Sequence, residues 1–456
     1  MRTKIILLLI FIIVLNINKW SNSIFIERLL ASLLLFTGTI PFLYKLEKKE
    51  ANLPFFEFIS LFYILFYSLP IFFIDLKEEY MSGIYLRTPT LKGLFYANIG
   101  YLSLLSGFYS TRNTAIFKML PKLNVQLKRE DRIPLLSIAI FILGVLGEIF
   151  SPRAPFVFKA LFYFFNFFPR ISIYLLYFFF LRKKLNIFYI FFLFLIEIPY
   201  IVFKDMETGL LGPIVFDITG LIFAYWFVRK KMPFLYLILF FIIFIPFNYT
   251  KYDYRLYAWY GPYARKNIVE KTTINFTLLS DKFKNEKLNT FYNGWEVFVA
   301  RCNLLHNFTT AIEFTPDVIP YWKGYSLRPL LTAPIPRFVM PWKPQERMGQ
   351  DYGHRYGLLD PTDFSTSLNL PILDELYINF GIIGIIIGMF LIGIAYRILY
   401  RIINYEGMSF YTAIIGTIIF LVLLNIGSNI SLLFGNLIEY IVVLYIIFLI
   451  LQRIER

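Results

Sequence analysis

Charged residues are scarce in this sequence. Asp, Glu, Lys and Arg make up 16% of the 456 residues, whereas hydrophobic residues make up 58% and aromatic residues 20%. An average soluble domain has about a quarter of its residues charged. The composition therefore excludes a soluble globular protein, and it predicts an all-α, polytopic membrane protein.

Cysteine and histidine are almost absent as well. The chain has one cysteine, Cys302, and two histidines, His306 and His354. A single cysteine excludes a disulfide within the chain, and three such residues are too few for the usual zinc or iron–sulfur centres. Redox chemistry at such centres is excluded, no cofactor is expected, and any metal would have to be held by carboxylates.

Acidic residues are outnumbered by basic ones, 30 against 45, which makes the formal net charge +15. In a membrane protein the positions of these charges carry more information than their sum. Most of the excess falls in short loops, where it suits an anionic membrane surface, so membrane lipids are expected partners and nucleic acid is not.

Apolar runs separated by short charged loops predict about twelve membrane-spanning helices. The first run follows Arg2 and Lys4 and has no small-residue cleavage site after it, so we expect it to remain as the first helix. The predicted spans are 4–19, 24–44, 54–76, 91–110, 133–150, 156–181, 187–203, 209–228, 233–250, 372–396, 409–427 and 430–451.

The distribution of basic residues sets the expected orientation. With the N-terminus inside, the inner segments hold 21 Lys and Arg and the short outer loops hold five, as the positive-inside rule requires. Both termini are then cytoplasmic. The chain divides into spans one to nine (1–250), a large outer loop (251–371) and spans ten to twelve (372–456).

The outer loop has an excess of basic residues, 15 Lys and Arg against 11 Asp and Glu, on the side where the rule leaves few. Its segment 290–314 predicts an amphipathic helix lying against the membrane, with Phe298, Cys302 and Ile312 on or near one stripe. Arg301 lies beside this stripe. It is interpreted either as a side chain that reaches to the interface or as a bidentate clamp on a phosphate.

Five prolines between residues 329 and 344 exclude a regular helix there and favour a stiff, extended segment. Arg328, Arg337 and Lys343 lie on this segment. They suit a bulky anion held at fixed geometry, and the alternative is an ordered loop with solvated charges.

Aromatic and polar residues alternate around and after the proline-rich segment, including Trp342, Arg347 and His354. Aromatic faces interleaved with carboxylates and amides suit sugar rings, whose C–H faces stack while their hydroxyls form hydrogen bonds. His354 could act as a general base near neutral pH, although a loop histidine is more often simply exposed.

The start of the tenth span carries two adjacent carboxylates, Asp374 and Glu375. They are interpreted either as a favourable helix start or as a base under the arginine-lined loop. Glycines at 381, 384 and 388 would permit close helix packing. Elsewhere, charged residues within predicted spans are functional candidates because they are costly in lipid: Glu148, Arg170, Glu197, Asp217 and Glu439.

Two strings, Ala333-Pro-Ile-Pro-Arg337 running into Pro341-Trp-Lys-Pro344, and Asp374-Glu-Leu-Tyr-Ile-Asn-Phe-Gly381, together with the layout of spans, resemble a known family. They resemble Wzy-type oligosaccharide repeat unit polymerases of bacterial O-antigen and exopolysaccharide assembly. The resemblance is sharp over about 320–395. The positions that match its pattern are Arg337, Lys343, Glu375, Tyr377, Asn379 and Gly381.

The resemblance implies a membrane glycosyltransferase of GT-C-like architecture in the inner membrane, with 251–371 in the periplasm. Its substrates would be undecaprenyl-diphosphate-linked oligosaccharides, and a chain-length regulator and a flippase are expected partners. The catalytic candidates are Arg337, Glu375, His354 and Asp374. The candidates for binding diphosphate or sugar are Arg301, Arg328, Lys343, Arg347, Trp342, Tyr377 and Asn379.

Two further readings remain open. An O-antigen ligase, or another transferase that uses lipid-linked sugars, would share the donor and the layout. A flippase or other transporter of lipid-linked glycans would use the intramembrane charges but would usually have shorter loops.

Overall fold

The structure is a computed structural model. It describes residues 2–17, 25–73, 88–110, 119–126, 130–151, 165, 167–209, 212–264, 266–286, 289–333, 335, 340, 342–343 and 346–454. Within these ranges all regular structure is helical. The prediction of an all-helical chain is therefore confirmed for the described residues, and the catalytic candidate Arg337 lies outside them.

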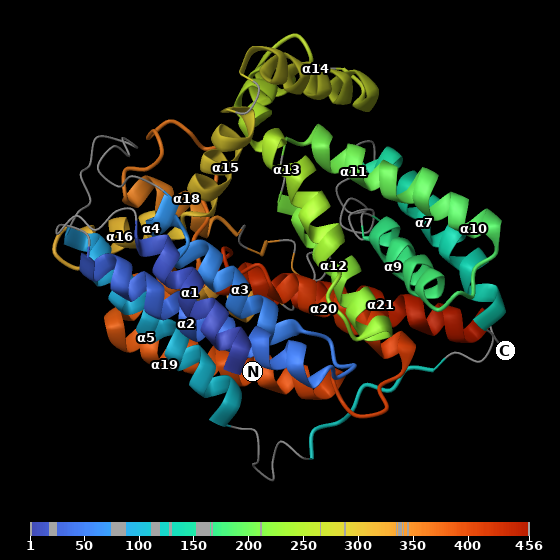
Figure 1. Cartoon of the computed structure of the whole chain (residues 1–456), viewed down its shortest axis with the longest axis horizontal. Helices are drawn as coiled ribbons and strands as arrows, with labels where there is room; N and C mark the ends of the chain where they lie inside the picture. Colours follow the sequence, from blue (N-terminus) through green and yellow to red (C-terminus); the bar gives the residue numbers. More distant parts are fainter. Residues whose placement is uncertain are drawn as a thin grey trace.

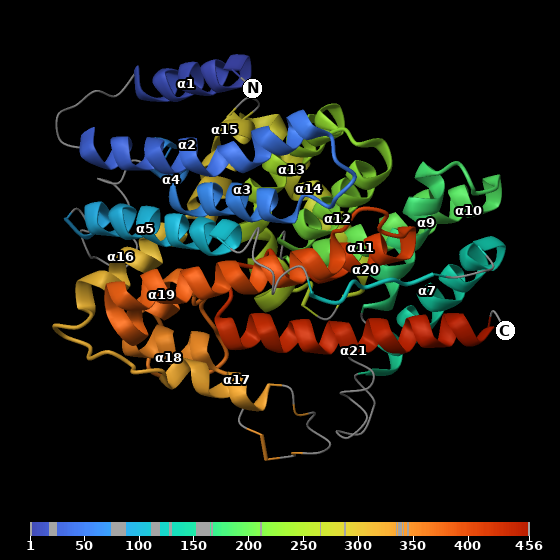
Figure 2. The same cartoon turned by 90° about the horizontal axis from the view of Figure 1, so that it is seen from below.

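The helices form two groups (Figures 1 and 2). The groups meet directly where Phe223 and Phe216 pack against Phe58 and Phe62, and helices of the predicted outer loop also contact both groups. The first group contains α1 (Arg2–Ile17), α2 (Phe25–Lys48), α3 (Phe55–Tyr67), α4 (Pro70–Phe73), α5 (Thr88–Ser110) and α19 (Ile372–Ile403). The second contains α7 (Ile133–Phe150), α9 (Phe168–Leu181), α10 (Ile187–Phe192), α11 (Ile198–Glu207), α12 (Gly212–Arg229) and α13 (Phe234–Arg255). The last two helices are α20 (Phe410–Leu423) and α21 (Ile430–Ile454).

The predicted outer loop is largely helical. It contains α14 (Ile268–Glu286), α15 (Asn289–Cys302), α16 (Leu304–Phe314), α17 (Arg328–Thr332) and α18 (Met348–Arg355), with a short 3₁₀ turn, η5 (Tyr325–Leu327), before α17. The expected single amphipathic helix over 290–314 is interrupted at Asn303. The Asn303 side chain accepts a hydrogen bond from the backbone N–H of His306 and so caps α16.

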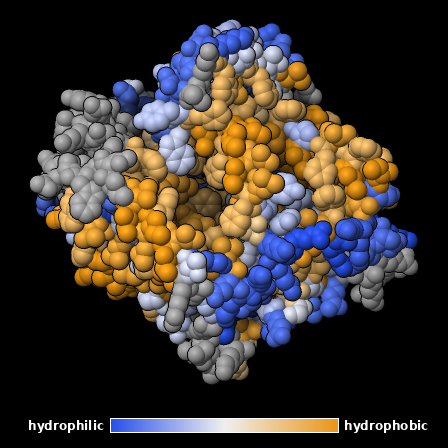
Figure 3. Space-filling view, in the orientation of Figure 1, coloured by the Kyte–Doolittle hydropathy of each residue, from blue (hydrophilic) through white to orange (hydrophobic). Residues whose placement is uncertain are grey.

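Eight helical elements of the described chain are long and apolar enough to cross a membrane, and three shorter apolar helices accompany them. The eight are Phe25–Lys48, Phe55–Phe73, Glu130–Phe150, Ile187–Glu207, Gly212–Arg229, Phe234–Tyr260, Ile372–Ile403 and Ile430–Leu449. Figure 3 shows hydrophobic side chains between two hydrophilic regions, one over α14 and one at the lower right of the view. The chain therefore has the surface of a multi-pass membrane protein.

Close contact between α5 and α19 holds the first group together, and the two helices lie side by side in both views (Figures 1 and 2). A Cβ at Gly107 of α5 would lie 2.1 Å from the Phe390 carbonyl oxygen of α19, and one at Gly393 would lie 2.3 Å from the Leu104 carbonyl oxygen. Only glycine allows the two backbones to approach this closely.

A sharp kink at Gly381 divides α19 into two helical parts. Gly381 has φ 65° and ψ −152°, a conformation that strongly favours glycine. The first part folds back on the second, because Cβ atoms at Gly384 and Gly388 would meet Leu376 of the same element. These two glycines therefore make room for the start of α19 itself, rather than for another helix as expected from the sequence.

Candidate functional site

Glu375 lies in the first part of α19 and is fully buried. Its Oε2 atom accepts a hydrogen bond of 2.6 Å from the backbone N–H of Ile430, the first residue of α21. The Ser326 hydroxyl interacts with this carboxylate, but no described residue forms a hydrogen bond of ordinary geometry with its Oε1 atom. A buried carboxylate that lacks some of its hydrogen bonds is costly unless a ligand or a proton completes its contacts. Glu375 is therefore a candidate catalytic residue.

A second carboxylate, Glu346, lies at the same end of α21. Its two oxygens accept hydrogen bonds from Asn429 Nδ2 at 2.6 Å and from Ser431 Oγ at 2.9 Å. The negative charges of Glu346 and Glu375 interact with each other. Two carboxylates from other segments, Glu346 and Glu375, therefore lie next to each other at the start of α21. They differ in how completely their oxygens are hydrogen-bonded, an arrangement that suits acid–base chemistry.

Asn379 fastens the segment before α17 to α19. Its Oδ1 accepts a hydrogen bond of 2.7 Å from the Gly324 backbone N–H, and its Nδ2 donates to Ser326 Oγ at 2.7 Å and to the Glu375 carbonyl oxygen. The Trp322 backbone N–H donates to the Ile378 carbonyl oxygen at 2.8 Å. Asn379 is 1% exposed, so in this structure it positions the segment 322–326 next to Glu375.

Arginines cover the aromatic rings of the same segment. The Arg355 guanidinium lies 4.6 Å from the centre of the Trp322 ring and 5.2 Å from that of Tyr325, and Arg328 lies 5.4 Å from the same Tyr325 ring. The Tyr325 hydroxyl donates a hydrogen bond to Asp351, and burial together with Asp351 raises the pKa of Tyr325. Arg328 is thus engaged by cation–π contact in this structure.

His354 lies in a separate contact. Its Nε2 atom is 2.9 Å from the Asp363 carbonyl oxygen, and its ring meets Phe364 edge-on. The Asp363 carboxylate accepts hydrogen bonds from Ser365 and Thr366, which hold its pKa well below the usual range. None of these contacts joins His354 to Glu375.

The other residues predicted from the sequence occupy varied places. Asp374 is fully buried and interacts electrostatically with Tyr63, Tyr67, Tyr352 and Tyr356. The Tyr377 hydroxyl donates to the Thr315 carbonyl oxygen at 3.0 Å. The Lys343 ammonium donates to the carbonyl oxygens of Ala333 and Ile335, Trp342 is 76% exposed, and Arg347 is exposed just before α18.

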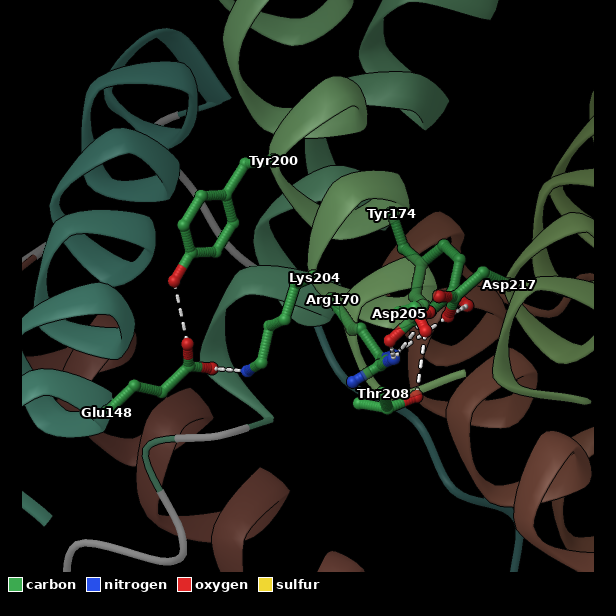
Figure 4. A network of polar contacts seen from close by, with 8 residues as sticks. All are labelled: Glu148, Arg170, Tyr174, Tyr200, Lys204, Asp205, Thr208 and Asp217. Carbon is green, nitrogen blue, oxygen red and sulfur yellow. Dashed lines mark hydrogen bonds and ion pairs between the residues drawn. The ribbon is translucent and has the colours of Figure 1, made fainter. Parts of the chain in front are cut away.

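A second polar cluster joins α9, α11 and α12 (Figure 4). Arg170 of α9 donates to both oxygens of Asp205 on α11, at 2.8 and 3.0 Å, and to Asp217 on α12 at 2.9 Å. The Tyr174 hydroxyl points to Asp217 from the same side as Arg170 (Figure 4). The sequence singled out Arg170 and Asp217 as costly charges, and the structure joins them directly and adds Asp205 as a second partner of Arg170.

Two further carboxylates lie near this cluster, the half-buried Glu148 and the buried Glu197. Glu148 of α7 accepts hydrogen bonds from Tyr200 at 2.7 Å and from Lys204, both on α11 (Figure 4). Glu197 accepts a hydrogen bond of 2.6 Å from Ser172, which is on α9. These charged residues of the spans therefore tie neighbouring helices of the second group together.

The polar clusters do not form a metal site. In the part of the chain that the structure describes, no group of three or more His, Cys, Asp or Glu is arranged to hold a metal ion.

The model of one protein family, described as "Domain of unknown function (DUF8712)", matches residues 87–455. The chain belongs to this family. The DUF8712 match begins at the start of α5 and contains Glu346, Glu375 and all members of the Arg170 cluster. No curated protein and no solved structure matches the chain.

Glu346 and Asp205 are the residues that sequence reasoning missed as site candidates. Glu346 stands among several charged loop residues, and nothing in its spacing predicts contact with residues 83 and 85 positions away. Asp205 lies near the expected outer end of the seventh span, next to Lys204. The predicted layout puts Arg170 near the middle of the sixth span, so the orientation of the spans alone did not predict this contact.

Proposed function

We propose that the chain polymerises oligosaccharide repeat units linked to undecaprenyl diphosphate at the outer face of the inner membrane. The observation that carries the proposal is the incompletely paired, buried carboxylate of Glu375, held next to Glu346 and under the segment 322–326. Twelve spans, a GT-C-like architecture and a periplasmic location for 251–371 belong to the same proposal.

The chemistry follows from these groups. A hydroxyl of the incoming repeat unit attacks the anomeric carbon of the growing glycan, and the bond from that carbon to the diphosphate oxygen breaks. Glu375 takes the proton of the hydroxyl, and the electron pair leaves with the diphosphate. Basic side chains, among them Arg301 and Arg337, stabilise the charge that develops on the leaving group.

The test is the length profile of surface glycan from cells that lack the gene and carry a restored copy. We expect single repeat units in the deletion strain, a ladder with the wild type, and no ladder with Glu375→Gln, because glutamine keeps hydrogen-bonding capacity but cannot act as the base. Arg337→Ala is expected to behave similarly. Glu313→Gln is the matched control, since Glu313 is an exposed acid of α16.

Other outcomes would favour the alternatives. Loss of all surface glycan, with lipid-linked repeat units accumulating inside, would replace the polymerase by a transporter. The Arg170, Asp205 and Asp217 cluster is the observation that favours a transporter, because charges within spans often line transport pathways. Long lipid-linked chains that never reach their acceptor would point to a ligase. A normal ladder with Glu375→Gln would remove Glu375 from the mechanism.

A further inference from the structure

Glu197 is the central residue of the candidate span Ile187–Glu207, and its side chain is fully buried. It ends a π-helical turn, η3 (Leu193–Glu197), which joins α10 to α11. The adjacent residues Leu195 and Ile196 are exposed, so Glu197 faces the inside of the helix group. An ionised acid in the middle of a span is costly, and single π turns within α-helices are rare and frequent at functional sites.

No cation neutralises Glu197. Among the described residues it forms no ion pair, and the other charged residues of the helices that meet here are paired with one another. These pairs are Arg170 with Asp205, Glu148 with Lys204 (Figure 4), and Glu207 with Lys271. The two tyrosines nearest to them in the helices, Tyr174 and Tyr200, are bonded to Asp217 and Glu148.

Two short contacts surround the Ser172 hydroxyl of α9. Its oxygen lies 2.6 Å from Glu197 Oε1 and 2.7 Å from the carbonyl oxygen of Ser137 on α7. Each is the distance of a full O–H···O hydrogen bond. A serine hydroxyl has one hydrogen and a carbonyl can only accept, so Ser172 can donate in only one of the two contacts. The Ser137 hydroxyl does not help, because it donates to the Ile133 carbonyl oxygen.

The second hydrogen has to come from Glu197. If Ser172 donates to an ionised Glu197, the contact between Ser172 and the Ser137 carbonyl holds two oxygens together with no hydrogen between them. If Glu197 is protonated, it donates to Ser172, Ser172 donates to Ser137, and both contacts are hydrogen bonds. Glu197 Oε2 is buried with no hydrogen-bond partner among the described residues, which costs less for a neutral carboxyl than for an ion.

We infer that Glu197 is a proton-binding site in the middle of the membrane-spanning part and holds its proton at neutral pH. The bound proton joins α11 to α9 and, through Ser172, to α7. Its release leaves a buried charge without a cation and one contact without a hydrogen, so ionisation weakens this junction of three helices. The inference does not depend on the proposed function, which uses Glu375.

The first test is infrared difference spectroscopy of the full-length protein at neutral pH in dodecyl maltoside, a detergent without a carbonyl group. The spectrum of the wild type minus that of Glu197→Gln should show the carbonyl stretching band of a protonated carboxyl, since all other carboxyls are present in both samples and cancel. Glu148→Gln is the matched control, because Glu148 is paired with Lys204, and it should show the bands of an ionised carboxylate instead. Carboxylate bands for Glu197→Gln would overturn the inference.

The direction of the hydrogen bond is tested at Ser172. Ser172→Ala removes the acceptor of the Glu197 proton and should shift the carbonyl band, whereas Ser172→Thr keeps a hydroxyl and should leave the band near its place. Each band is isolated by subtracting the spectrum of the same variant with Glu197→Gln added. A band that does not move in Ser172→Ala would show that Glu197 does not donate to Ser172.

Stability gives an independent readout. A glutamate exposed to water by unfolding ionises above about pH 4–5, so at higher pH only the folded state keeps this proton. The unfolded state then binds fewer protons than the folded state, and stability falls as the pH rises. The thermal midpoint of the wild type should therefore fall relative to that of Glu197→Gln between about pH 5 and pH 8.

A difference between the two midpoints that does not change with pH would mean that Glu197 is ionised in the folded protein, and it would overturn the inference. Glu197→Gln itself should fold, because its amide can donate to Ser172 as the protonated acid does. Misfolding of Glu197→Gln, but not of Glu148→Gln, would also count against a neutral Glu197.

Discussion

At the scale of single residues, Arg170 joins three helices by neutralising two carboxylates at once. Its side chain is 28% exposed, and those of Asp205 and Asp217 are 6% and 20% exposed. Partial burial makes these ion pairs sensitive to the loss of one partner, because removing the cation leaves two carboxylates that repel each other.

We expect Arg170→Ala to reduce the free energy of unfolding by about 3 kcal/mol, the lower end of the range for breaking a buried ion pair. Chemical denaturation of the protein in detergent would measure the loss. Lys266→Ala is the control, since Lys266 and Glu270 form an exposed pair at 3.4 Å, and its effect should stay within about 0.5 kcal/mol. Similar losses for both variants would mean that the Arg170 network contributes no more than a surface pair.

Residue types in the sequence were enough to select some of these groups. A carboxylate or arginine inside an apolar run is unusual, and that feature alone singled out Arg170 and Asp217. Glu375 was selected by its place at the start of the tenth span and by the resemblance. Glu346 and Lys251 stand in polar or terminal segments, where a charge is ordinary. Only the fold shows that one lies beside Glu375 and that the other is buried.

At the scale of elements, the kink of α19 decides where the start of the helix lies. Periodicity predicted a continuous tenth span, and the structure divides it at Gly381, where φ is 65°. The Tyr321 hydroxyl lies 2.8 Å from the position that a Cβ on Gly381 would occupy. Backbone conformation and space therefore both require glycine at this position.

Gly381→Ala should reduce the free energy of unfolding by about 1–3 kcal/mol, which is the usual cost when a residue other than glycine is held in an unfavourable backbone conformation. Thermal denaturation in detergent would measure it. Gly212→Ala serves as the control, because Gly212 opens α12 with nothing within 4 Å of its would-be Cβ, and a change of less than about 1 kcal/mol is expected there. If Gly381→Ala proved as stable as the control, the kink would not depend on glycine.

At the scale of the whole molecule, the ends of α13 provide a test of orientation. Lys231 precedes α13, and Lys284 lies in α14, which follows it. The two exposed lysines should therefore lie on opposite sides of the membrane, with Lys231 inside by the positive-inside rule.

Labelling of introduced cysteines can test this expectation in the protein that still contains its natural cysteine, Cys302. Burial raises the pKa of Cys302 to about 12, so its thiol stays protonated and should not react with maleimide at pH 8. In spheroplasts, an impermeant maleimide should label Lys284→Cys, and it should label Lys231→Cys only after permeabilisation. The reverse pattern would invert the proposed topology, and labelling of the folded wild type would show that Cys302 is accessible.

The amino-acid sequence by itself determined the class of the protein, the approximate positions of its apolar helices and several costly charges. These properties depend on composition and on patterns within some 20 residues of chain. The tertiary structure decided which of these charges meet: Glu375 is bonded to a backbone N–H 55 residues away, and Glu346 to Ser431, 85 residues away. Contacts at such separations depend on how the helices pack, and no local pattern in the sequence encodes them.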